Sequence, residues 1–565
     1  MSRGSAQVDS NNGADLVVHD RGRLNAILSV VCLSLFVVMS GVTMINIGLP
    51  KIASDLGATA TQMTWIMSIY PLVLAGLLLF SGAIGDRYGR RYLLMIGLAI
   101  FGFAALGSLF VSDPTMMIAL RAVMGLGAAA IMPSTLSIIT TSFPVERRGK
   151  AIGIWAAVLG AAGVIGMLVS GTLLEFFSWH SLFLFTLVLA VAAFVATYFI
   201  VPNSKVEHAP RLDFVGAILS LAAVVGLVFG IIEGSKAGWS SPGILLAIPI
   251  GLISGVAFIL WELRQENPLL DPRIFKLRGL SAGVLSNTVQ TVGVIGFYFI
   301  LTQYVQYVLG YSPLIAALSM LPIALFVIPV SIVSSKFVQR YGYNKIGGLG
   351  LLILASGFVV FSFVTVDMNP WIFFSGISLI GLGLGFSQAP ATAAISGSLP
   401  PSKQGIASAI NDTTKAVGEV TGTAVAGAVL VAVYTNGVAS FTSGLQPQAA
   451  EAVNNGIPTA SQAAQQIGGA AGEQIRAAAD QAFVSGVTGV MIVAAVLVAL
   501  GALYVFFRGP HKISEQPIEN GEEPAELEEG ADTDRVERVP TGASISNTDG
   551  EAPGGERDLI PTPRT

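Results

Sequence analysis

The fold of this chain is decided by the stretch Gly82-Ala83-Ile84-Gly85-Asp86-Arg87-Tyr88-Gly89-Arg90-Arg91. It is a short charged turn between two long apolar runs, at about 62–84 and 92–111. Its glycines let two helices approach closely and reverse direction, whereas its arginines cannot enter hydrocarbon. The stretch therefore predicts a turn held at the cytoplasmic face of a membrane.

The composition indicates a protein that crosses the membrane many times. Of its 565 residues, 53% are hydrophobic and 11% are charged, whereas soluble domains carry about 25% charged residues. A helix of about 20 apolar residues spans a bilayer. We expect such helices near 24–49, 62–84, 92–112, 115–140, 151–175, 181–202, 214–234, 242–263, 280–308, 313–334, 346–366, 371–396, 404–434 and 483–507. The predicted class is therefore an all-α polytopic membrane protein with about fourteen transmembrane helices.

A second turn of the same kind lies far downstream, at Gln339-Arg340-Tyr341-Gly342-Tyr343-Asn344-Lys345. Both turns contain Arg-Tyr-Gly, at 87–89 and at 340–342. An internal repeat of this kind indicates that the fold is built from two related units. The first turn joins the second and third expected helices, and the second joins the tenth and eleventh. Two six-helix bundles with two extra helices between them give this offset directly.

The predicted organisation follows from this offset. We expect an N-terminal cytoplasmic tail at 1–23, a first six-helix bundle at 24–203, two extra helices with a cytoplasmic linker at 204–278, a second six-helix bundle at 279–508 with a long outer loop near 437–482, and an acidic disordered tail at 509–565.

Orientation follows from the distribution of Lys and Arg, which collect in cytoplasmic loops. One set of loops is nearly bare, apart from Lys51, Lys236 and Arg476. The alternate loops hold Arg87, Arg90, Arg91, Arg147, Arg148, Lys150, Lys205, Arg211, Arg264, Arg273, Lys276, Arg278, Arg340, Lys345 and Lys403. We therefore expect both termini in the cytoplasm.

The sequence also excludes several classes of site. Cys32 is the single cysteine, so the chain cannot form a disulfide framework or a cysteine metal site. The histidines (His19, His180, His208 and His511) are scattered, which argues against a metal cluster. No phosphate-binding lysine motif follows the glycine-rich stretches. We expect no ATP drive, no enzymatic activity, no cofactor and no nucleic-acid partner, and we expect a monomer.

Several motifs resemble those of one family. The turn at 82–91, Asp86 included, is similar to the loop 2–3 signature of the major facilitator superfamily. Leu120–Ala129 resembles its helix-4 signature, with Met124 where a glutamine is usual. Trp65–Tyr70 and Gln306–Pro313 are typical of its fourteen-helix drug:proton antiporter group, the EmrB/QacA-like proteins. The resemblance covers residues 24–508 and implies the major facilitator fold.

Two departures from this group bear on coupling to protons. The first expected helix keeps the pattern around Asn46 and Pro50 but has Gly41 where the group usually carries an aspartate. The fifth has Met167 where the antiporter signature has a proline, and it lacks the first of the paired glycines before Gly171. Both changes weaken the expectation of ordinary proton-driven export.

Asp412, Lys415 and Glu419 lie inside the expected span 404–434, where an ionisable residue is costly unless it is paired or hydrated. Their spacings of three, four and seven place them on one helical face. One interpretation is a structural ladder in which Lys415 is clamped between the two acids. The other is that they face a cavity whose low dielectric favours reversible protonation of a carboxylate. Asp412 is then the first candidate for the proton site and Glu419 the second.

Arg121 is the other charge expected within a span. The family resemblance implies a role in proton transfer, and the alternative is an arginine satisfied by helix carbonyls. For the turn at 82–91, we expect Asp86 to accept hydrogen bonds that close the cytoplasmic side, with Gly82, Gly85, Arg87, Gly89, Arg90 and Arg91 completing the gate. A pure topology anchor is the alternative.

The expected cavity lining is apolar with a few polar groups, a mixture that tolerates many ligand shapes. Ordinary helix packing remains the alternative for each residue. The candidates are Asn46, Trp65, Tyr70, Met124, Gln290, Phe299, Gln303, Tyr304, Gln388 and Asn411.

The family resemblance implies a secondary transporter of a bacterial inner membrane that works by alternating access. We expect export of hydrophobic or cationic compounds in exchange for protons, with membrane lipid as the surrounding partner. One alternative is a dedicated carrier of a lipid-like or anionic metabolite with weak or absent proton coupling. A second is a transport-inactive membrane sensor that signals through its acidic tail.

Overall fold

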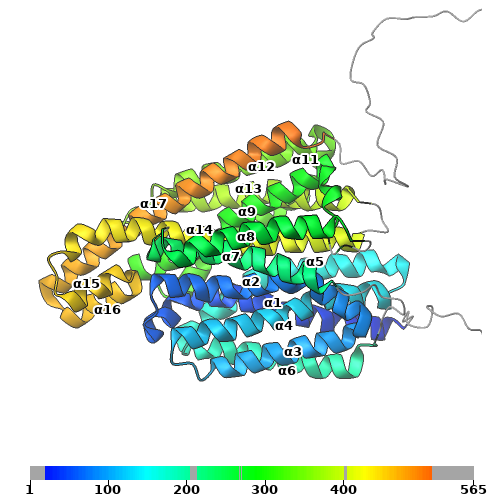
Figure 1. Ribbon diagram of the computed structural model, residues 1–565, viewed down its shortest axis with the longest axis horizontal. Helices are drawn as coiled ribbons and strands as arrows, with labels where there is room; N and C mark the ends of the chain where they lie inside the picture. The colour runs from blue at the N-terminus through cyan, green and yellow to red at the C-terminus, as the bar shows by residue number, and fades with distance from the viewer. Residues whose placement is uncertain are drawn as a thin grey trace, which may run out of the picture. The chain divides into compact units, whose positions relative to one another are not determined.

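The computed structural model describes residues 20–203, 213–238, 240–265, 268, 270–399 and 404–511, which fold almost wholly into helices (Figure 1). The predicted all-α membrane class is confirmed. Thirteen helices in the described ranges are long and apolar enough to cross a membrane. The span expected near 151–175 lies in the 32-residue helix α5, whose shorter apolar part is Ala161–Phe176. Most of the predicted acidic tail, from residue 512 onward, lies outside the described residues.

The first bundle is built from the six helices α1 (Arg21–Leu56), α2 (Ala60–Tyr88), α3 (Arg90–Ser108), α4 (Pro114–Ser142), α5 (Val145–Phe176) and α6 (His180–Ile200). α4 packs against α1, α2 and α3, and α1 also packs against α5 and α6. Side chains fix where these helices begin. Thr59 and Gln62 form a capping box at α2, and the Asp113 carboxylate accepts a 3.0 Å hydrogen bond from Met116 N at α4.

The second bundle begins with α9 (Arg278–Gln303), which continues into the π-helical turn η2 (Tyr304–Val308). A short 3-10 turn, η1 (Pro272–Lys276), precedes α9. α10 (Pro313–Ser319) and α11 (Leu321–Tyr341) form one span that breaks just before Pro322, a residue without a backbone N–H. The remaining helices are α12 (Tyr343–Phe361), α13 (Pro370–Gly397), α14 (Gln404–Thr442) and α17 (Gly469–Arg508).

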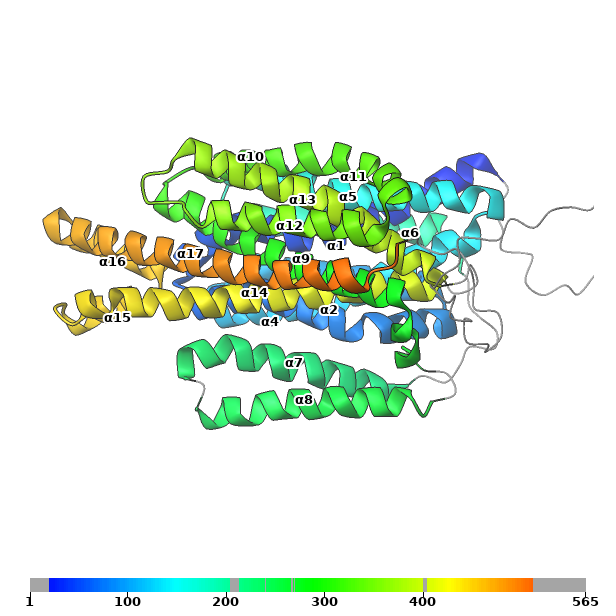
Figure 2. The same cartoon turned by 90° about the horizontal axis from the view of Figure 1, so that it is seen from above.

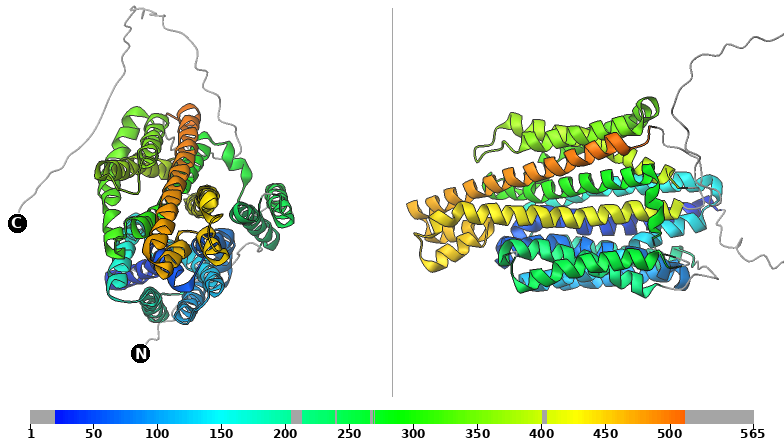
Figure 3. Two further views of the ribbon diagram at one scale, coloured as in Figure 1. Left: turned by 90° about the vertical axis from the view of Figure 1, so that its left-hand side faces the viewer. Right: turned by 45° about the horizontal axis from the view of Figure 1, so that its top comes forward.

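α7 (Phe214–Ala237) and α8 (Pro242–Glu262) form a separate pair beside the two bundles (Figures 2 and 3). The two helices approach closely, since a Cβ added to Gly226 would lie 2.8 Å from Ala247 O. α7 packs against α2 and α14. α8 faces outward, with Leu246 64% and Ile253 66% exposed. Large exposed apolar side chains on a long apolar helix indicate a lipid-facing surface.

The two bundles meet along α2 with α14 and along α5 with α10. At one end, α14 and α17 extend past the other helices, and α15 (Pro447–Asn454) and α16 (Ile457–Ile467) lie between them (Figure 2). We call this the hairpin end, and the opposite end, where the turns around Arg90 and Arg340 lie, the basic end. The segment expected as a loop, 437–482, is therefore largely helical.

The two Arg-Tyr-Gly turns adopt the same local structure at the basic end. Gly89 (φ 115°) alone joins α2 to α3, and Gly342 (φ 90°) alone joins α11 to α12. In each turn the arginine lies over the ring of the following tyrosine, at 5.9 Å for Arg87 and 5.3 Å for Arg340. The sequence repeat is thus a structural repeat, and each glycine supplies a backbone conformation that other residues rarely adopt.

Each turn is also closed by the end of the last helix of its own bundle. A Cβ at Gly89 would lie 2.6 Å from Asn203 Oδ1, just past α6. A Cβ at Gly342 would lie 2.7 Å from the backbone oxygen of His511, just past α17. Tyr343 N donates a 3.1 Å hydrogen bond to that same oxygen.

We expect Gly89→Ala to lower the free energy of unfolding by ~1–3 kcal/mol, because alanine at positive φ is strained and its Cβ meets Asn203. Denaturant titration of the purified chain in detergent measures this change. Gly153→Ala is the matched control, because Gly153 has no neighbouring atom within 4 Å of an added Cβ. Equal stability of the two variants would show that the turn does not need glycine.

Candidate functional site

α14 carries three ionisable residues where it passes between the bundles. Asp412, Lys415 and Glu419 are each partly exposed, and α14 packs against α2 of the first bundle and α9 of the second. In the described structure no ion pair joins Lys415 to either acid. Lys415 nevertheless lies within electrostatic reach of both acids, so the ladder and the cavity-facing proton site both remain predictions.

A buried network of amides and hydroxyls supports Asp412. Asn411 Nδ2 donates to Asp412 Oδ1 at 3.2 Å, and Asn287 Nδ2 donates to Asn411 Oδ1 at 3.2 Å. Gln290 Nε2 donates to Asn287 Oδ1 at 3.1 Å, and Ser387 Oγ donates to Gln290 Oε1 at 2.5 Å. The network joins α9, α13 and α14. Gln290 and Asn411, expected to line the cavity, thus have protein partners.

Arg121 on α4 is fully buried in the first bundle, at 1% exposure. Its Nε donates to Ile66 O at 3.1 Å, and its Nη1 donates to Gly41 O at 2.5 Å. The guanidinium lies 4.6 Å from the Tyr70 ring centroid. These contacts match the interpretation in which helix carbonyls satisfy Arg121.

Gly41 supplies a backbone oxygen at the position where the family resemblance implied an acid. A Cβ there would lie 2.9 Å from Phe101 Cζ and 3.4 Å from the Tyr70 ring. The first bundle is therefore packed around a glycine at this point. The Tyr70 ring lies beside the Arg121 guanidinium, and its hydroxyl donates a 2.9 Å hydrogen bond to Val38 O on α1.

The other predicted cavity residues are dispersed along the bundles. Asn46 Oδ1 accepts a 2.6 Å hydrogen bond from Thr302 Oγ1, and Tyr304 Oη donates to Thr365 O at 2.7 Å. Met124 and Phe299 are buried, at 1% exposure each, and Gln388 is partly exposed on α13. Of the predicted set, Gln303 lines a cavity, and that cavity lies at the hairpin end.

Sequence reasoning missed Glu233 on α7. Its Oε1 accepts a 2.7 Å hydrogen bond from Trp65 Nε1 on α2, which ties the extra helix pair to the first bundle. An acid inside the expected span 214–234 was the available signal. Asn287 and Ser387 were also missed, and isolated polar residues in apolar runs gave only a weak signal.

Hydrogen bonds join the two bundles at the hairpin end. Gln306 Nε2 donates to Ile47 O at 3.0 Å, and Tyr307 Oη donates to Pro50 O at 2.7 Å. Both donors lie on η2, and both acceptors lie on α1. Together with the bond from Thr302 to Asn46, they hold α1 against the end of α9.

At the basic end, the described contacts of the predicted gate stay within the first bundle. Arg91 Nη2 donates to Tyr198 O on α6, and its guanidinium lies 5.3 Å from the Tyr198 ring centroid. A Cβ at Gly85 would lie 3.0 Å from Leu93 Cδ2, and one at Gly82 would lie 3.7 Å from Pro133. The side chain of Asp86 lies outside the described residues.

We expect Arg121→Lys to destabilise the chain by ~1.5–3 kcal/mol, because an ammonium cannot reproduce the forked donation to two carbonyls. The midpoint of denaturant unfolding in detergent measures the loss. Arg23→Lys, at an exposed position, is the control. An unchanged midpoint for Arg121→Lys would contradict a carbonyl-satisfied structural arginine.

A sequence profile of the Major Facilitator Superfamily matches residues 31–213 and 211–423. The multidrug efflux pump LfrA of Mycolicibacterium smegmatis is 32% identical over 479 residues, which cover 85% of this chain and 95% of LfrA. The puromycin resistance protein pur8 of Streptomyces alboniger is 30% identical over 412 residues, covering 72% and 81% of the two chains. An inward-facing bacterial homologue of the human lysosomal transporter Spinster superposes with a TM-score of 0.60 at 15% identity, covering 87% and 98%; this likeness concerns the fold alone.

Proposed function

Because this chain belongs to the Major Facilitator Superfamily, we propose that it is a secondary transporter that exports hydrophobic and cationic drugs or toxic compounds in exchange for protons. The names of the relatives, an efflux pump and a puromycin resistance protein, support drug export. The observation that carries proton exchange is the charged face of α14, where Asp412 and Glu419 are partly exposed at the contact between the bundles.

Protons and a cationic substrate compete for the same two carboxylates. A carboxylate that is accessible and not ion-paired can take up a proton, and its negative charge attracts a cation. Binding of one discourages binding of the other, which is the requirement for exchange. Lys415 moderates the site, so that protonation of one acid leaves it close to neutral.

The orientation that we propose places the basic end in the cytoplasm of a bacterial cell, in line with the positive-inside rule. The bundles are then hydrogen-bonded to each other at the outer, hairpin end. We infer that the structure corresponds to a state closed to the outside, and that opening outward requires the bonds of Gln306 and Tyr307 to α1 to break. The chain works as a monomer within membrane lipid.

We expect Asp412→Asn to abolish proton movement that depends on substrate, because asparagine cannot exchange a proton. The measurement is proton release from inverted vesicles that contain the chain, on addition of ethidium, a lipophilic aromatic cation. No other ion gradient or energy source is supplied. Asp113→Asn is the control, since asparagine also caps a helix such as α4. Glu419→Gln, tested in parallel, identifies the second acid. Ethidium transport without proton movement, unchanged in Asp412→Asn, would overturn proton exchange at this site.

Lys415→Gln separates cation export from carriage of an anionic metabolite. We expect the variant to keep ethidium efflux, because removal of a positive charge does not weaken binding of a cation. Efflux rates are measured in cells at matched protein levels. If the variant loses transport, and if the unaltered chain moves an anionic amphiphile instead, the dedicated anion carrier becomes the correct function.

A further inference from the structure

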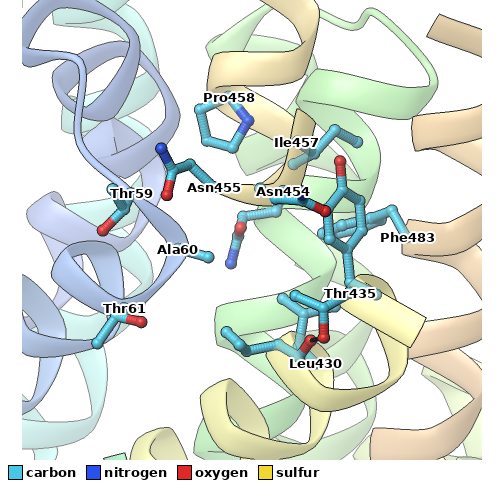
Figure 4. Close-up of a pocket in the computed structure, with 14 residues that line it drawn as sticks. Thr59, Ala60, Thr61, Leu430, Thr435, Asn454, Asn455, Ile457, Pro458 and Phe483 are labelled. Atoms are coloured by element: carbon cyan, nitrogen blue, oxygen red, sulfur yellow. Dashed lines mark hydrogen bonds between the residues drawn. The ribbon is translucent and has the colours of Figure 1, made fainter. Parts of the chain in front are cut away.

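A cavity of about 240 Å³ lies at the hairpin end, away from the charged face of α14. Its walls come from both bundles: Thr59 at the start of α2, Gln303 at the end of α9, Tyr434 on α14 and Phe483 on α17. The turn between α15 and α16 covers it (Figure 4). A ligand here would contact both halves of the protein at once.

The turn between α15 and α16 seals the cavity against the first bundle. Ala60 N on α2 donates a 2.9 Å hydrogen bond to Asn455 O. A Cβ at Gly456 would lie 2.9 Å from the Ala60 Cβ, so the two backbones are in close contact. Gln462 Nε2 on α16 donates to Ser54 O of α1. Separation of the bundles at this end would open the cavity.

One buried polar group in the cavity wall has an unused hydrogen-bonding capacity. The Tyr434 side chain is 3% exposed, and its hydroxyl has no hydrogen-bond partner among the described residues. A buried hydroxyl without a partner is unfavourable, so such groups in native proteins call for an explanation. Figure 4 shows the Asn454 amide extending into the space between α2 and α14. These two groups could both bind a ligand with polar substituents.

The residues that line the cavity are all uncharged. The acid near it, Asp480, already pairs with Arg476 at 3.7 Å. The rings of Tyr434 and Phe483 suit an aromatic ligand, and the amides and hydroxyls suit its polar substituents. At about 240 Å³, the cavity is smaller than the usual ligand pocket of about 300–1,000 Å³, so it fits a compact molecule.

We propose that this cavity is a release site for compact, uncharged aromatic substrates that carry hydroxyl or amide groups. Such a substrate occupies it on the way out, before the hairpin end opens. The proposal rests on the proposed export function and adds a substrate class that the acids of α14 do not select. Cationic substrates are recognised at α14, and uncharged aromatic ones by Tyr434 and Asn454.

Chloramphenicol is a suitable probe, because it is an uncharged aromatic compound with hydroxyl and amide groups. The full chain carrying Cys32→Ser and Asn454→Cys is labelled with a fluorescent maleimide, with and without chloramphenicol. We expect the probe to slow labelling at position 454 several-fold. Ser443→Cys, exposed on the same hairpin end, is the matched control and keeps its rate. Equal rates at position 454 with and without the probe would overturn the proposal.

Tyr434→Phe tests the same site by transport. Loss of one hydrogen bond raises the KM for chloramphenicol roughly two- to tenfold and leaves the KM for ethidium unchanged. Because the hydroxyl has no hydrogen-bond partner in the described part of the chain, the variant keeps its stability, which a purely structural tyrosine would not. Tyr198→Phe, on an exposed part of α6, is the control. An unchanged KM for chloramphenicol would contradict the release site.

The two proposals fail in different ways. In Asp412→Asn, loss of proton exchange leaves the release site intact, so chloramphenicol should still protect Asn454→Cys. Protection without any transport would retain the binding site and reject the export function. Transport with neither protection nor a change of KM would retain export and reject the release site.

Discussion

The architecture depends on one constraint, that hydrocarbon solvates neither a charge nor an unpaired backbone group. Helices meet the backbone requirement, and most of the described Lys and Arg residues lie near helix ends. Arg121 meets the requirement by donating to two carbonyls and lying over an aromatic ring. Asp412, Lys415 and Glu419 do not form ion pairs with one another in the described structure. We therefore propose that these residues, rather than Arg121, carry the proton and substrate chemistry.

The buried polar residues form two separate sets of hydrogen bonds, one within the second bundle and one between the bundles. The amide network of Asn287, Gln290 and Asn411 fixes α9, α13 and α14 to one another, which positions the charged face of α14 on a rigid support. The hydrogen bonds from Gln306 and Tyr307 join different bundles and lie at one end. Support within a bundle and attachment between bundles are thus made by separate residues, so the attachment can break without loss of the support.

Much of the fold could be predicted from the sequence, because its signals are local. Long apolar runs identified the spans, and Arg-Tyr-Gly at 87–89 and 340–342 identified the equivalent turns. The site was less predictable. Gln290 was expected to face a ligand, but its side chain is hydrogen-bonded to Ser387, 97 positions away in the sequence. The periodicity of a single helix does not reveal a contact between residues so far apart. The helices α15 and α16 lie in a stretch rich in Ala and Gln, whose weak hydrophobicity resembles that of a loop.

The closure of each Arg-Tyr-Gly turn by the end of its own bundle has a mechanical consequence. Asn203 contacts the first turn and His511 the second, so the sixth helix of each bundle returns to the junction between its second and third helices. Each bundle is thereby tied at the basic end, where its last helix contacts the turn between its second and third helices. A movement of one bundle relative to the other would therefore have to occur where the two touch, along α2 with α14 and α5 with α10.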